Sequence, residues 1–178
     1  MKHSHLTDEL AKMEKKRNDL FEKLSAYDIE VLTKKPVAEA WSVIQVIEHM
    51  LTVELAALSY VKKKSQDKAA AQKTGFKEWM RSMLLNRFLK SSKKKFPAPP
   101  SVLPIVKYAS LNEMREQWNA IRHDIQETIL AMPADLLGHN WFKHPSVGKL
   151  NLKQMITFME SHYDRHEKQV WRTLKEVS

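Results

Sequence analysis

The stretch LNEMREQWNAIRHDIQETILAM, residues 111–132, decides the fold class of this chain of 178 residues. Its apolar side chains recur every three or four residues, at Leu111, Met114, Trp118, Ile121, Ile125, Ile129 and Met132. This spacing predicts a long amphipathic α-helix with one buried face. Ser110 and Glu113, in the order of a capping box, mark its beginning. The fold therefore depends on what the rest of the chain packs against this face.

The same periodicity predicts three further long helices. The first is expected to end before LTKKPVAEAW, residues 32–41, where Pro36 breaks the pattern. Its stripe consists of Leu6, Leu10, Met13, Leu20, Leu24, Tyr27 and Val31. Ser42 can cap a second helix that runs to about Lys64, and Asn151 can cap a last helix over residues 152 to about 175. A shorter helix is expected over residues 76–90. Its predicted apolar side consists of Trp79, Met83, Leu84 and Phe88.

The connections between these helices are expected to be irregular. FPAPPSVLP, residues 96–104, holds four prolines, which remove backbone donors and predict an extended crossover in place of a helix. Residues 133–149 are expected to form a long loop, because Gly138, Pro145 and Gly148 interrupt them. No segment shows the alternation of a strand. We therefore predict one domain over residues 1–178, an all-α four-helix bundle with an extra short helix and long crossover loops.

The composition limits the function classes. No run of about 18 apolar residues could cross a bilayer, and the N-terminus lacks the apolar region of a secretory signal, so we expect a cytoplasmic protein without a membrane partner. The absence of cysteine leaves histidine and carboxylate as the strong metal ligands. The formal net charge is +9, but the lysines at 62–64 close one predicted helix and those at 93–95 follow another, where cations complement the helix dipole. Nucleic-acid binding through a convergent lysine face is the weaker interpretation.

Two histidines lie one helical turn apart near the end of the chain. In ESHYDRHEKQVW, residues 160–171, His162 and His166 fall in line with Met155 and Met159, so they project into the predicted bundle. Two adjacent buried imidazoles repel if charged and both need partners if neutral. A shared metal ion would solve both problems. The spacing is that of helical HxxxH zinc sites, although spacing alone is a weak signal.

A metal site needs a third ligand, and the candidates are His49, His123, His139 and His144. His49 lies on the flank of the second helix's apolar stripe, where it can turn toward a neighbouring helix. Geometry alone leaves two interpretations open, a ligand and an ordinary half-exposed histidine, and the second is commoner.

Glu54 and His144 are the candidates for acid–base chemistry. Glu54 occupies the centre of the second helix's apolar stripe, where an uncompensated carboxylate is costly. A salt bridge across the bundle, or a hydrogen bond behind a ligating histidine, explains such a residue more often than catalysis does. His144 belongs to a loop that could cover the open side of a metal ion. A structural role of the His-Pro pair at the entry to the last helix fits equally well.

Three segments resemble the DinB-like superfamily. AWSVIQVIEHMLTVE, residues 40–54, is similar to the segment in which a Trp-Ser pair opens the second helix and a histidine binds metal. HPSVGKLNLKQMITFMESHYDRHEKQV, residues 144–170, resembles the family's C-terminal signature with its HxxRHxxQ-like end. FPAPPSVLP is similar to the proline-rich crossover of this group. Together these segments cover about a third of the chain, in the family's order, and are far more specific than HxxxH.

The resemblance implies a bundle of up-down-down-up type in which His49, His162 and His166 hold a divalent metal ion. Zinc and nickel are the first candidates, although three histidines discriminate weakly among metals. Characterised members of the family include metal-dependent thiol transferases and a thiol-dependent isomerase, and many others have no assigned activity. The resemblance therefore implies a small-molecule substrate, with a low-molecular-weight thiol favoured. It is also compatible with a homodimer, but the sequence itself shows no self-complementary patch.

Two classes of function remain open from the sequence. The first is a metal-dependent enzyme, because three histidines leave a coordination position open, where a cation can activate a thiol or a water molecule. Thiol S-transfer is favoured over hydrolysis. The second is a metal-binding bundle whose site is structural and whose function is to bind a partner. A substrate-sized pocket that opens onto the metal would favour the enzyme.

Overall fold

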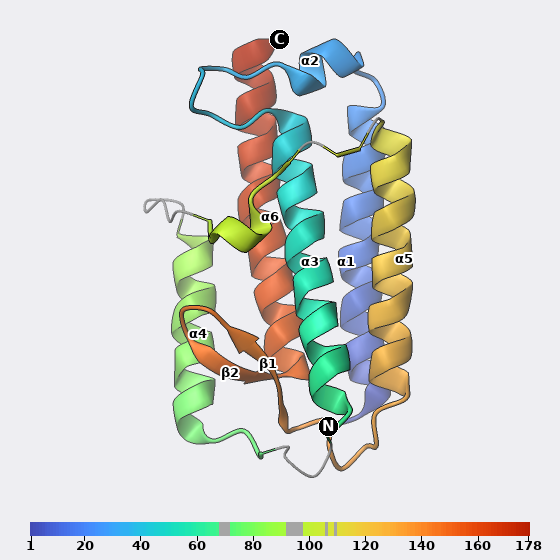
Figure 1. Ribbon diagram of the computed structural model, residues 1–178, viewed down its shortest axis with the longest axis vertical. Helices are drawn as coiled ribbons and strands as arrows, with labels where there is room; N and C mark the ends of the chain where they lie inside the picture. Colours follow the sequence, from blue (N-terminus) through green and yellow to red (C-terminus); the bar gives the residue numbers. More distant parts are fainter. Residues whose placement is uncertain (68–71, 92–97, 106, 109) are drawn as a thin grey trace.

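The computed structural model describes residues 1–67, 72–91, 98–105, 107–108 and 110–178. The elements follow one another as α1 (His3–Leu24), α2 (Ile29–Thr33), α3 (Val43–Ser65), α4 (Phe76–Lys90), the 3-10 helix η2 (Pro100–Val102), α5 (Leu111–Leu130), β1 (Asn140–His144), β2 (Gly148–Asn151) and α6 (Leu152–Val177). Helices α1, α3, α5 and α6 form a bundle (Figure 1). Since α1 and α6 run one way and α3 and α5 the other, the order is up-down-down-up. The predicted all-α bundle is confirmed.

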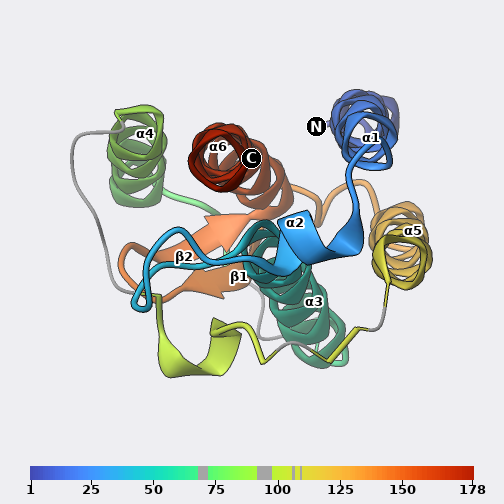
Figure 2. The ribbon, with the colours of Figure 1, turned by 90° about the horizontal axis from the view of Figure 1, so that it is seen from above.

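The four long helices close into a ring around one hydrophobic core. Helix α3 packs on α6 and α5, and α1 packs on α5 and α6. Figure 2, seen from above, shows α4 outside this ring and beside α6. By length and composition α3 is apolar enough to cross a membrane, but 61% of that window is buried in the bundle, which is the behaviour of a core helix.

Reciprocal caps fix where the two histidine-bearing helices begin. The Ser42 hydroxyl accepts from the Gln45 amide at 3.3 Å, and the Ser42 amide donates to the Gln45 side chain at 3.0 Å. Asn151 and Gln154 form the same pair at the start of α6, with both distances 2.9 Å. Each pair satisfies amides that the first helical turn leaves without partners. The caps therefore anchor the beginnings of α3 and α6, the two helices that carry the histidines.

The first helix is shorter than the periodicity predicted. Helix α1 ends at Leu24, and a separate short helix, α2, begins at Ile29. Tyr27, assigned to the buried stripe, is 39% exposed, whereas Leu32 of α2 is fully buried. The prediction was wrong here because Tyr27 and Val31 happen to continue the spacing of α1 across a break in the backbone.

The expected loop over residues 133–149 contains a β-hairpin, so the statement that no strand occurs was wrong. Strands β1 and β2 pair antiparallel, with Phe142 opposite Leu150 and His144 opposite Gly148. Gly148 has φ +81°, a left-handed conformation that glycine adopts readily and that suits the turn. The strands are only five and four residues long, too short for a clear alternation.

Two further expectations need correction. Trp79, Met83 and Leu84 were assigned to the buried side of α4, but each is about half exposed, and Ser82 and Leu85 face the bundle in their place. In the proline-rich crossover, residues 96 and 97 lie outside the described part of the chain, and η2 forms one 3-10 turn where no helix was expected. Pro100 stands at the first position of this turn, where a missing amide costs nothing.

Candidate metal site

Three histidines converge between α3 and α6. His49 comes from the first third of α3, and His162 and His166 come from the middle of α6. One potential ligand nitrogen from each residue lies within 4.8 Å of the other two. The Nε2 atoms of His49 and His162 are 3.2 Å apart, and the ring centroids of His162 and His166 are 4.4 Å apart. The structure thus brings together the three residues that the sequence and the resemblance selected.

Hydrogen bonds orient two of these rings. The carbonyl oxygen of Val102 lies 2.8 Å from Nδ1 of His49, and the side-chain oxygen of Gln169 lies 2.9 Å from Nδ1 of His166. An oxygen of this kind only accepts, so Nδ1 carries the proton and Nε2 keeps its lone pair. Partners behind the ring fix the tautomer of metal-ligating histidines in the same way.

Burial keeps the three imidazoles neutral. It lowers the pKa of His166 to about 3 and the pKa of His162 well below its ordinary value, and neighbouring histidines add to both effects. Burial also lowers the pKa of His49, against the opposing hydrogen bond to Val102. At neutral pH all three rings therefore present lone pairs, the form that binds a metal ion.

The donor set fits a divalent cation. Zinc–nitrogen bonds of about 2.0–2.1 Å in a tetrahedron give a nitrogen–nitrogen edge of about 3.3 Å, close to the 3.2 Å between His49 and His162. The three ligand nitrogens lie within 4.8 Å of one another, a limit wider than the nitrogen–nitrogen distance expected around zinc. His166 therefore has to move slightly toward the other two histidines to share one ion with them. Three imidazoles leave at least one position for another ligand.

The site has an aromatic wall and a proline-rich cover. The Trp41 ring lies 5.0 Å from that of His49, and the Phe158 ring lies 5.6 Å from that of His162. The crossover is tied to α3 beside the site, because Val102 accepts from His49 and the Lys107 amide donates to Glu48 at 3.2 Å. These contacts keep η2 over the histidines.

His144 ends strand β1 near the cluster but is not one of its three members. Its ring packs edge-on against Phe158, with centroids 4.6 Å apart, and its Nδ1 accepts from the Ser146 amide at 3.2 Å. Burial lowers its pKa to about 4, so the ring is neutral at pH 7 with its proton on Nε2. His144 is thus a hydrogen-bond donor at neutral pH.

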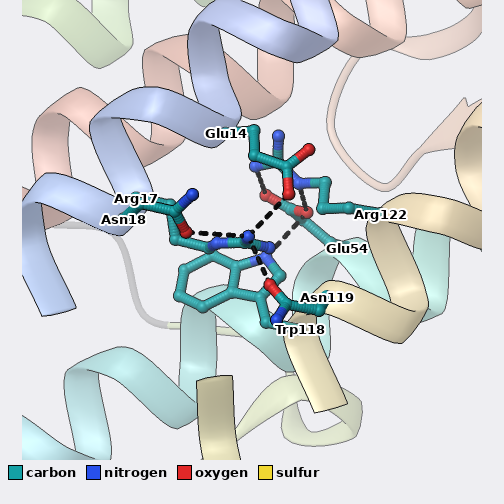
Figure 3. Close-up of polar contacts among 7 residues, drawn as sticks. All are labelled: Glu14, Arg17, Asn18, Glu54, Trp118, Asn119 and Arg122. Carbon is teal, nitrogen blue, oxygen red and sulfur yellow. Dashed lines mark hydrogen bonds and ion pairs between the residues drawn. The ribbon is translucent and has the colours of Figure 1, made fainter. Parts of the chain in front are cut away.

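Glu54 is held by Arg122 and Trp118 (Figure 3). Its carboxylate accepts from Nε and Nη2 of Arg122 and, at 2.8 Å, from the indole of Trp118. All three residues are buried. Five residues separate Glu54 from His49, which turns the two side chains about 140° apart around α3. The salt bridge considered as the alternative to catalysis is therefore present.

Sequence reasoning missed the groups behind the histidines. Val102 acts through a backbone carbonyl, which no sequence motif marks. The contact of Gln169 with His166 could have been predicted, since a residue three positions further along a helix lies beside the first. Arg122 could also have been placed beside Trp118, because it follows Trp118 by four residues and lies on the same face of the helix.

The support from Gln169 can be tested directly. We expect Gln169→Leu to weaken zinc affinity about 10- to 100-fold, the usual effect of losing a partner behind a ligating histidine. Competition with a chromophoric chelator measures this affinity. Lys168→Leu, an exposed change at the adjacent position, is the matched control and should leave the affinity unchanged. Equal affinities for both variants would show that Gln169 does not support the site.

The chain is an up-down-down-up helical bundle whose three inward histidines, at the contact between α3 and α6, could hold a metal ion. The chain belongs to the DinB superfamily, whose family model matches residues 12–170. It is similar to the uncharacterized protein YuaE of Bacillus subtilis (strain 168), with 24% identity over 154 residues that cover 86% of this chain and 90% of YuaE. No solved structure matches the chain.

Proposed function

We propose that this protein is a metal-dependent enzyme that transfers a low-molecular-weight thiol to an electrophilic small molecule. The observation that supports it is the convergence of His49, His162 and His166 with their nitrogens within 4.8 Å of one another. Three neutral ligands fit a site with an open position, as in catalytic zinc centres. Membership of the DinB superfamily, whose family model matches most of the chain, supports a metal-dependent function for these three histidines.

The thiol must come from a substrate, since the chain has no cysteine. A divalent cation held by the three histidines would favour the deprotonated form of a thiol bound to it. In the overall reaction the sulfur forms a bond to carbon, the leaving group departs with the electrons of the broken bond, and the thiol proton is released. The protein's own part is to hold neutral imidazoles in place and to surround the reacting sulfur with Trp41 and Phe158.

His144 and Glu54 receive different roles in this proposal. His144, neutral with its proton on Nε2, would donate a hydrogen bond to the substrate and would not act as a base. Glu54 would stabilise the fold, because Arg122 and Trp118 occupy both of its carboxylate oxygens.

Cobalt substitution tests the proposal. Addition of a small thiol, such as cysteine or a cysteinyl sugar, to the cobalt-loaded protein should produce a sulfur-to-cobalt charge-transfer band in the near ultraviolet. The same thiol should then be consumed with an alkylating acceptor in a metal-dependent reaction. The His162→Ala, His166→Ala double variant should show neither. If no thiol changes the cobalt spectrum and the protein hydrolyses esters in a metal-dependent reaction, the proposed activity is hydrolysis and not thiol transfer.

A further inference from the structure

The outer face of α4 is apolar although it faces away from the bundle. Its exposed side chains follow one another at spacings of three and one residues: Phe76 at 72%, Trp79 at 52%, Met80 at 41%, Met83 at 48% and Leu84 at 55%. At 3.6 residues per turn these positions form a single stripe. The opposite side of the helix carries Ser82 and Leu85, which are buried against the rest of the molecule. We call the outer positions, with Arg87 and Lys90, the α4 stripe.

The α4 stripe has two chemically different ends. At its N-terminal end the rings of Phe76 and Trp79 stack, with centroids 5.6 Å apart. At its C-terminal end Arg87 and Lys90, both exposed, continue the same face. Met80, Met83 and Leu84 lie between the aromatic end and the cationic end.

The geometry points to a second copy of this chain as the partner of the α4 stripe, bound antiparallel with Met83 of both copies at a two-fold axis. In this register Trp79 of each copy faces Arg87 of the other, and Phe76 faces Lys90. A cation is attracted to the face of an aromatic ring, and Arg with Trp is among the most favourable pairs. A two-fold axis makes each such contact twice, so the stripe is self-complementary.

The size and composition of the stripe suit a protein interface. The five apolar side chains expose on the order of 500 Å² per copy, judged from the usual areas of such residues. Two copies then bury about 1,000 Å² before flanking residues are added, which approaches the size of a specific interface. Aromatic residues, methionine and arginine are also the types enriched in such interfaces. At one edge of the stripe, Trp79 and Met83 line a groove together with Asn86 and the start of α6, which can receive side chains of the partner.

The antiparallel register also reduces the repulsion between the basic residues of two α4 helices. Its basic residues are Lys77, Arg81, Arg87 and Lys90, against a single acid, Glu78. A parallel pair would place Arg87 and Lys90 against the same residues of the other copy. The antiparallel pair places them against aromatic rings and also opposes the two helix dipoles. An anionic lipid surface is the competing partner for a basic amphipathic helix, but it does not use the separation of aromatic and cationic ends.

Sedimentation velocity over a range of concentrations tests the pairing. We expect the native chain to dimerise, and Trp79→Ser to raise the dissociation constant at least tenfold. Arg87→Glu should have the same effect, because the cation facing Trp79 is lost. Tyr27→Ser is the matched control, since Tyr27 is 39% exposed but lies outside the stripe. Circular dichroism confirms that each exposed change leaves the helices intact.

Single cysteines test the register, because the native chain contains none. Met83→Cys should form a disulfide-linked dimer rapidly under mild oxidation. Phe76→Cys should not, since the two positions 76 lie roughly 21 Å apart in the antiparallel pair, beyond the reach of a disulfide. A chain that stays monomeric at every concentration would overturn the proposal, as would equal cross-linking of both variants. A monomer that sediments with phosphatidylglycerol vesicles would assign the stripe to a membrane surface.

Discussion

Protein purified without a His tag is expected to carry about one divalent ion per chain, and the His162→Ala, His166→Ala double variant is expected to lose it. The reason is geometric. Both histidines lie on one face of α6 opposite His49, and the variant leaves a single imidazole, which binds a divalent ion weakly. Inductively coupled plasma mass spectrometry measures the metal content and identifies the ion at the same time.

The control variant removes two histidines outside the cluster. His5 and His123 are both exposed, so His5→Ala, His123→Ala should retain the metal of the native chain. Binding to the folded state also stabilises it by mass action, so a chelator should lower the melting temperature of the native protein and of this control, but not of the His162→Ala, His166→Ala variant. A native chain that takes up neither zinc nor nickel when either is added would contradict the metal site and the function built on it.

The sequence predicted the elements that bury a regular face. Helices α3, α5 and α6 each carry apolar side chains at the helical period over many turns, and polar caps at Ser42, Ser110 and Asn151 mark their starts. His162 and His166 could be paired from the sequence because residues four apart on a helix are neighbours. His49 was different. Its partner helix is more than 100 residues away in the chain, and periodicity gives a face but not the neighbour of that face. Only the family resemblance connected it to α6.

The features that sequence reasoning missed are short or depend on packing. Two strands of five and four residues leave no period to detect, and the break between α1 and α2 falls where apolar spacing continues by coincidence. Helix α4 carries apolar residues on both its outer and its inner side, so the sequence could not indicate which side faces the bundle. Leu85 faces inward, whereas Trp79 and Met83 face outward. The exposed apolar side of α4 is what suggests a second molecule as its partner.

The second large effect is expected at the salt bridge between Glu54 and Arg122. We expect Glu54→Ala to lower the free energy of unfolding by about 3–5 kcal/mol, because it leaves a buried guanidinium without its carboxylate. The loss extends beyond one pair. Arg17, fully buried, lies near Arg122, and burial together with this neighbouring charge lowers its pKa. Its Nη2 donates to Asn119, Asn18 and the half-exposed Glu14 (Figure 3), so Glu54 is the buried carboxylate of a cluster with two arginines.

Urea denaturation measures this effect, and a paired variant separates its causes. In Glu54→Leu, Arg122→Met both charges are replaced by apolar groups of similar volume, so much of the stability lost in Glu54→Ala should return. Full recovery is not expected, since the Trp118 indole then lacks its acceptor. Metal content and thiol binding should survive in the paired variant, because Glu54 projects away from His49. If the Glu54→Ala protein had native stability but no longer bound thiol, Glu54 would have a role in the reaction and not in the stability of the fold.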